Sequence, residues 1–138
     1  MARITRNDIE TMARTIWGEA RGEGAPGMEA VAHVIKNRTR DPRWPGSFES
    51  VCLQPRQFSC WNENDPNRAQ LVKLGNDDLS FLRAQAIALD VITLRLADST
   101  YGANHYLTVD LFRSAHRPAW ADPETITARI GRHVFFEL

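Results

Sequence analysis

Cysteine is scarce in this chain, because Cys52 and Cys60 are the only two among its 138 residues. They stand eight positions apart, and no histidine is spaced from them as the ligands of a zinc site are. We therefore expect two small buried thiols. The alternative is a disulfide that closes a short loop, which would require an oxidising compartment.

The chain also lacks an excess of charge of either sign. Lys+Arg and Asp+Glu each number 17, so the formal net charge is zero. An overall basic field of the kind that drives binding to nucleic acid or to anionic membranes is therefore absent. We expect neither as a partner.

Long apolar runs are missing as well. No stretch approaches the roughly 20 apolar residues of a membrane span, and residues 1–10 lack the apolar core of a secretory signal. We expect synthesis in the cytoplasm without a signal peptide and without stable membrane insertion. If the substrate lies outside, another agent must deliver the protein, or a signal has been removed.

The composition of the chain is that of one globular domain, residues 1–138, with 43% hydrophobic residues. Apolar spacing predicts a helix over about residues 6–20 and a second from Pro26 through AVAHVIKNR. A third should follow a cap at Asn76 or Asp77, and its apolar circumference predicts a central, largely buried helix.

Between and after these helices the chain changes character. Residues 41–66 are rich in proline and aromatics, which predicts a long ordered loop region with short strands. Residues 99–109 and the C-terminal stretch predict short extended segments. The fold class expected is α+β and mostly helical.

The stretch TIWGEARGE, residues 15–23, carries the first candidate for chemistry. Glu19 lies at the edge of the apolar stripe of the first helix, where partial desolvation favours the protonated form that a general acid needs. Gly18 and Gly22 each weaken a helix by roughly 1 kcal/mol relative to Ala, so we expect a close approach by another backbone or a ligand. The alternative is a solvated pair of acids, Glu19 and Glu23, at a fraying helix end.

Other chemistries have weaker support. None of the four histidines forms a His-x-x-x-His pair, which argues against zinc, and sequence does not bring either cysteine beside a histidine. We expect His33 to be partly buried and paired with Glu29 one helical turn away. The aromatics of the middle region could supply groove walls in an enzyme that processes sugars, and for Phe48 and Phe58 core packing is an equal alternative.

Five motifs, in order along the chain, carry a family resemblance: GEARGE at residues 18–23, NR at 37–38, QFSC at 57–60, HY at 105–106 and IGRHVFF at 130–136. Together they resemble the spore cortex-lytic (SleB-type) cell wall hydrolases, which also occur as phage endolysins. The resemblance implies a lysozyme-like α+β fold that cleaves peptidoglycan glycan strands between N-acetylmuramic acid and N-acetylglucosamine. It matches Glu19 to the catalytic glutamate. Because no set of residues has the spacing of metal ligands, we expect no metal and no cofactor.

The resemblance further implies that the sugar groove is lined by Gln57, Phe58, His105 and Tyr106. The chain departs from the family pattern at Trp17, where Tyr is more usual, and at the two residues that flank the HY motif, Asn104 and Leu107. These departures concern contacts with the substrate. We expect the partner to be the glycan strand and the protein to be a monomer.

Two mechanisms share Glu19. In a lytic transglycosylase one glutamate suffices, because the C6 hydroxyl of muramic acid serves as the nucleophile. In a muramidase a second carboxylate assists water, and Glu23, Asp41 and Glu49 are the candidates. A non-catalytic glycan-binding module is the alternative from a different class.

Overall fold

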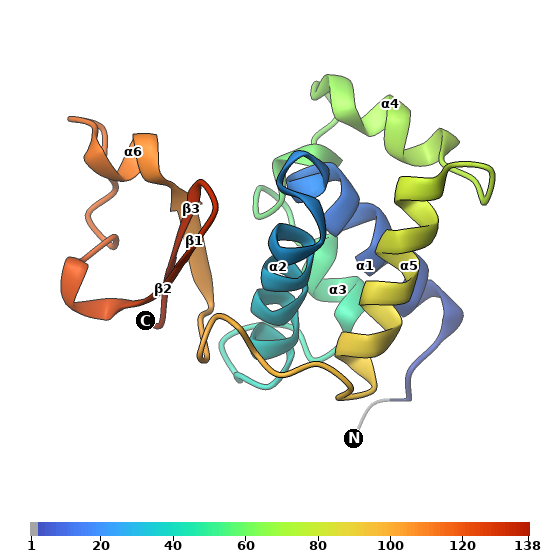
Figure 1. Cartoon of the computed structure of the whole chain (residues 1–138), viewed down its shortest axis with the longest axis horizontal. Helices are drawn as coiled ribbons and strands as arrows, with labels where there is room; N and C mark the ends of the chain where they lie inside the picture. The colour runs from blue at the N-terminus through green and yellow to red at the C-terminus, as the bar shows by residue number, and fades with distance from the viewer. Residues whose placement is uncertain (1–2) are drawn as a thin grey trace.

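A computed structural model describes residues 3–138, and Figure 1 shows how its elements are arranged. Helices α1, α2 and α5 pack side by side, and a small sheet lies on the outer side of α2 (Figure 1). This arrangement confirms the expected α+β, mostly helical class. The elements are α1 (Arg6–Ala20), η1 (Arg21–Glu23), α2 (Gly24–Thr39), α3 (Phe48–Cys52), η2 (Ser59–Trp61), α4 (Pro66–Lys73), α5 (Leu79–Ile92), β1 (His105–Thr108), α6 (Val109–Arg113), η3 (Pro123–Thr125), β2 (Ile126–Ile130) and β3 (His133–Phe136).

Helix α1 spans the predicted residues, and it is the central helix of the fold. Thr5 caps it in a reciprocal capping box with Asp8, which satisfies amide groups that the first turn leaves without partners. Its apolar stripe is buried, with Met12 and Ile16 at 0% exposure, and it contacts α2, α3, α4 and α5. The side chain that follows this stripe, Glu19, is therefore held on the most constrained helix of the molecule.

Helix α5 was predicted to be the central one, and this prediction was wrong. It buries one face, which includes Phe81 and Val91, against α1 and α2, while Leu79, Leu82 and Leu89 remain exposed. The apolar surface of α5 extends around most of its circumference, and its two neighbouring helices can cover only part of it. The cap was also misplaced by one residue or two, because the side chain that accepts the first-turn amide is that of Asp78.

Helix α2 begins two residues before Pro26, which occupies its first turn, where a missing N–H costs nothing. His33 is more buried than predicted, at 1% exposure. Its Nδ1 lies 2.9 Å from the carbonyl oxygen of Glu29, so the i, i+4 contact is with the backbone and not with the carboxylate. The other ring nitrogen lies 3.2 Å from the carbonyl oxygen of Leu96, and His33 thereby ties α2 to the segment after α5.

The middle of the chain is mostly irregular, as predicted, but the prediction of short strands there was wrong. Residues 41–66, all of them described, form no strand, and this region instead contains α3 and η2 before α4 begins at Pro66. The cap signals were present in the sequence: Ser47 accepts from the amide of Ser50, and Asp65 precedes a proline at the helix start. Both cysteines are free and buried here, which confirms the prediction of buried thiols.

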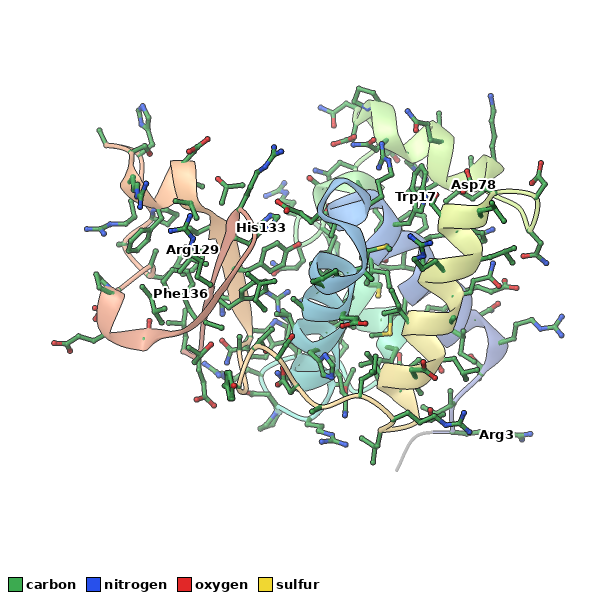
Figure 2. The ribbon with its side chains drawn as sticks, viewed as in Figure 1. Arg3, Trp17, Asp78, Arg129, His133 and Phe136 are labelled. Atoms are coloured by element: carbon green, nitrogen blue, oxygen red, sulfur yellow. The ribbon has the colours of Figure 1, made fainter. Side chains whose placement is uncertain are left out.

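The three strands form an antiparallel sheet in the order β1-β3-β2. Tyr106 pairs with Phe135 and Thr108 with His133, so these four side chains share the face that turns toward α2. The opposite face packs under α6 and the segment that follows it, with Phe136 fully buried (Figure 2). The extended segments were predicted and the helix α6 was not. Within residues 3–138, no helix is long and apolar enough to cross a membrane.

Candidate active site

Glu19 lies in the last turn of α1, where three segments distant in sequence converge. Its Oε1 accepts a hydrogen bond of 2.8 Å from the hydroxyl of Tyr106, on β1. Its Oε2 accepts a longer bond of 3.4 Å from the backbone amide of Cys60, on η2. The carboxyl group is half-buried and held by two donors, which orient it and stabilise the carboxylate that proton donation would leave.

Gly18 allows η2 to approach α1 this closely. A Cβ at Gly18 would lie 2.9 Å from the Cβ of Cys60 and 3.1 Å from Cδ2 of Leu71. The predicted close approach is thus confirmed for Gly18. At Gly22 no atom of residues 3–138, apart from its chain neighbours, lies within 4 Å of a Cβ built there, so no other backbone approaches it, and the alternative of a ligand stays a prediction.

Tyr106 is a permanent hydrogen-bond donor to Glu19. Burial raises the pKa of Tyr106 well above its usual value, and the nearby charge of Glu19 and the hydrogen bond to it act in the same direction. The phenol therefore keeps its proton throughout the physiological range. Its ring lies against Phe135, with centroids 5.7 Å apart, and edge-on to His133 at 5.4 Å.

A second acid lies beside this cluster. The Oε1 of Glu23 is 3.7 Å from Nδ1 of His133, and Figure 2 shows His133 at the end of the sheet nearest the helices. A Cβ at Gly131, where φ is +56°, would lie 2.6 Å from the Oε2 of Glu23, so the β2–β3 turn closes over this carboxylate. Burial lowers the pKa of His133, and the charges of Glu23 and Glu19 oppose that shift. Sequence reasoning placed His133 in a motif but gave it no role.

The other candidates for a second carboxylate lie elsewhere. Asp41 forms a bidentate pair with Arg43, and the hydrogen bonds from Arg43 lower the pKa of Asp41 to about 2. The amide of Glu49 donates to Asp8, at the opposite end of α1 from Glu19. Eleven residues of helix separate Asp8 from Glu19, about 16 Å at 1.5 Å per residue. Glu23 is the one of the three that the fold brings near Glu19.

Two of the four residues expected to line the sugar groove lie away from Glu19. Phe58 is 2% exposed and belongs to the core, so its ring has no free face for a sugar. The side chain of His105 points to the opposite face of β1 from that of Tyr106. Its ring lies between those of Trp44 and Trp120, with centroids 5.7 and 4.9 Å away. Successive strand residues point to opposite sides, so the HY motif could bring only one of its two side chains to the carboxyl.

Gln57 is exposed, and its Oε1 accepts from Nη1 of Arg38 at 3.4 Å. Arg38 is itself 5% exposed and was not among the predicted site residues. Its Nε donates 2.8 Å to the carbonyl oxygen of Asn104, directly before β1, and burial lowers the pKa of the guanidinium. Arg38 thus fixes the start of the strand that carries Tyr106, which gives the NR motif a structural role.

We expect the environment of His105 to make stability depend on pH. Burial, with Arg38 and Arg43 nearby, lowers the pKa of His105 to about 4, against an ordinary value of 6.5. The unfolded chain therefore binds the proton first, and the stability contributed by neutral His105 is present above about pH 6.5 and lost as pH falls toward 4.

After allowance for the partial exposure of His105, we expect this loss to be about 1–2 kcal/mol. His105→Phe keeps an aromatic ring between the two tryptophans and cannot titrate. Urea unfolding at about pH 7 and pH 4.5 should show a smaller decrease for the variant than for the natural chain. Equal decreases would contradict this account.

The histidines, cysteines and acids of residues 3–138 include no group of three placed to hold a metal ion. At Glu19 the structure places a carboxyl group between two hydrogen-bond donors. Such a group can donate and then accept a proton, which is the requirement for breaking a glycosidic bond.

Comparison of the chain with known proteins identifies the family to which it is similar. The family model described as Cell Wall Hydrolase matches residues 22–136, so Glu19 lies just before the matched region. The spore cortex-lytic enzyme of Halalkalibacterium halodurans is 32% identical over 129 residues, which are 94% of this chain and 34% of that relative. The Bacillus subtilis spore cortex-lytic enzyme is 32% identical over 134 residues, 97% of this chain and 39% of the relative. The chain thus spans less than half the length of these relatives.

Two solved structures extend the likeness to the whole fold. The catalytic domain of the germination-specific lytic transglycosylase SleB from Bacillus anthracis has a TM-score of 0.75 and 30% identity, with 99% of each chain covered. The catalytic domain of the Bacillus cereus SleB protein has a TM-score of 0.75 and 29% identity, with 99% of this chain and 94% of that one covered. The resemblance seen in the motifs is confirmed, and this chain belongs to the cell wall hydrolase family.

Proposed function

We propose that this chain is a peptidoglycan lytic transglycosylase domain that cleaves the bond between N-acetylmuramic acid and N-acetylglucosamine. The observation that carries the proposal is the carboxyl group of Glu19, fixed by Tyr106 and Cys60 at the junction of α1, β1 and η2. The likeness of the whole fold to the SleB catalytic domains supports it. No cofactor enters this chemistry.

The reaction needs two proton transfers and no added water. Protonated Glu19 gives its proton to the glycosidic oxygen as the bond from C1 of muramic acid to that oxygen breaks. The C6 hydroxyl of the same sugar then attacks C1 and gives its proton to the Glu19 carboxylate. A 1,6-anhydro ring forms and Glu19 regains its starting state. Because the nucleophile is part of the substrate, its attack is effectively unimolecular.

The hydrogen-bond donors around Glu19 stabilise the step of the reaction in which Glu19 is a carboxylate. When Glu19 has lost its proton, the hydroxyl of Tyr106 and the amide of Cys60 each donate to a different carboxylate oxygen and stabilise the negative charge.

The product separates the two mechanisms. We expect strands cut by this protein to end in 1,6-anhydro-N-acetylmuramic acid, one water lighter than a hydrolysis product, with no new reducing sugar. Mass spectrometry of digested, purified peptidoglycan measures this directly. Mainly reducing ends would replace this mechanism by that of a muramidase, in which Glu23 assists water and Glu19 remains the acid.

All three segments that hold Glu19 come from one chain, so we infer that a monomer is sufficient for activity. The proposed substrate is the wall polymer outside the cytoplasmic membrane, and the proposed site of action is there.

A further inference from the structure

A second feature of the surface is a hollow beside η2. Residues on both sides of η2, together with the end of η2 and the start of α4, line a hollow of about 740 Å³, here called the Trp61 hollow; its lining includes Arg56, Trp61, Asn62, Glu63, Asn64 and Arg68. Cys60, which donates to Glu19, directly precedes Trp61 in the chain. Nε1 of Trp61 donates 2.8 Å to Oγ1 of Thr15, one turn before Glu19 on α1. Trp61, which forms one wall of the hollow, is therefore tied to α1 one helical turn before the proposed catalytic acid.

The tryptophan in this hollow is fixed and half-buried. Its indole N–H donates a hydrogen bond to Thr15, and its ring packs partly against the main hydrophobic core. It therefore needs no ligand to orient it, and the part of its ring that remains uncovered is apolar. Aromatic rings held in this way pack against the apolar faces of sugar rings.

The amides beside Trp61 have no protein partner. The side chains of Asn62 and Asn64 make no hydrogen bond with any of residues 3–138, whereas four other asparagine side chains do: Asn37, Asn67, Asn76 and Asn104. An asparagine amide offers both donors and an acceptor, the combination that an N-acetyl group and ring hydroxyls require. These two amides are available to a ligand in the hollow.

The charges in the hollow are also without partners. Arg56 and Arg68 form no ion pair within 4 Å among the described residues, although Glu63 lines the same hollow. Two guanidinium groups against one carboxylate leave a positive excess, which favours a ligand that bears carboxylates. Muramic acid residues carry such groups on their peptide stems.

We propose that the Trp61 hollow is a subsite for an N-acetylated amino sugar of the strand, with its arginines directed to the carboxylates of a peptide stem. This inference rests on the proposed function and specifies where the strand continues beyond the bond that is cut. The aromatic ring, the amides and the arginines then each contact a different part of one muramyl peptide unit.

The test measures binding to a strand that is not cut. In the Glu19→Gln background, isothermal titration is carried out with a tetrasaccharide of alternating N-acetylglucosamine and N-acetylmuramic acid. Its lactyl groups bear either peptide stems or, in the ligand without stems, an uncharged methyl amide. Asn62→Ala with Asn64→Ala should raise the Kd about tenfold for both ligands, since each amide contributes a modest net hydrogen bond. Arg68→Ala should raise the Kd only for the ligand with stems. Arg129→Ala, an exposed arginine on the far face of the sheet, is the matched control and should change neither.

An unchanged Kd in the asparagine double variant would overturn the subsite. An equal effect of Arg68→Ala on both ligands, or no effect, would overturn the assignment of the arginines to the stems. Asn64→Ala alone, at an exposed position, provides a second variant should the double variant fail to fold. The two proposals fail separately: if the natural chain cuts peptidoglycan and the Kd is insensitive, only the subsite is wrong, whereas absence of cutting by the natural chain contradicts the proposed function.

Discussion

Glu19→Gln is expected to abolish cleavage of purified peptidoglycan, with kcat lowered at least about 100-fold, the lower end of the contribution of a general acid. Glutamine has nearly the same volume, and its one amide oxygen can still accept the shorter bond from Tyr106. Only the longer bond from Cys60 is lost, so the melting temperature should change little. The missing function is the proton that the amide cannot give to the glycosidic oxygen. Release of soluble muropeptides, followed by chromatography, measures the loss.

The matched control is Glu10→Gln, the same substitution at an exposed position of the same helix, and it should retain full activity. Glu23→Gln is the informative neighbour, because its carboxylate lies beside His133 in the same cluster. We expect it to lower activity less than Glu19→Gln. Full activity in the Glu19 variant, or equal losses in the two variants, would contradict the assignment of Glu19 as the sole acid.

Tyr106→Phe is expected to lower kcat by about 10- to 100-fold, because a hydrogen bond to a charged group contributes about 1.5–3 kcal/mol. The variant keeps the ring and its contacts with Phe135 and His133 and removes only the hydroxyl that donates to Glu19. KM should change little, because the residue acts through Glu19. Steady-state kinetics on soluble glycan strands separates the two constants.

Tyr101→Phe removes the same hydroxyl from a residue that is 76% exposed, and it should behave like the natural chain. If Tyr106→Phe instead lowers the melting temperature in step with activity, the hydroxyl serves the fold and not the reaction. Gln57→Ala changes an exposed side chain and should leave the fold intact. We expect it to lower turnover less than Tyr106→Phe does, since Gln57 contacts Arg38 rather than Glu19.

Local sequence signals were sufficient to predict features that depend on a single helix. The stripe that ends beside Glu19 predicted α1 from Arg6 to Ala20, and the small residue Gly18 predicted a close approach. The same reasoning failed for α5, because a helix that is apolar on most sides does not reveal which side its neighbours cover. It also failed for α4, although Asp65 and Pro66 form a recognisable helix start.

The sequence by itself determined the family and the mostly helical fold class, because motif order and helical periodicity are properties of the chain alone, and it predicted Glu19 as the candidate acid. Only the tertiary structure decided which residues surround that acid. The contact from Tyr106 to Glu19 spans 87 positions and that from Cys60 spans 41, and no local pattern encodes such separations. The pleat of β1 sends Tyr106 inward and His105 to the other side, a choice that depends on which face of the sheet meets α2.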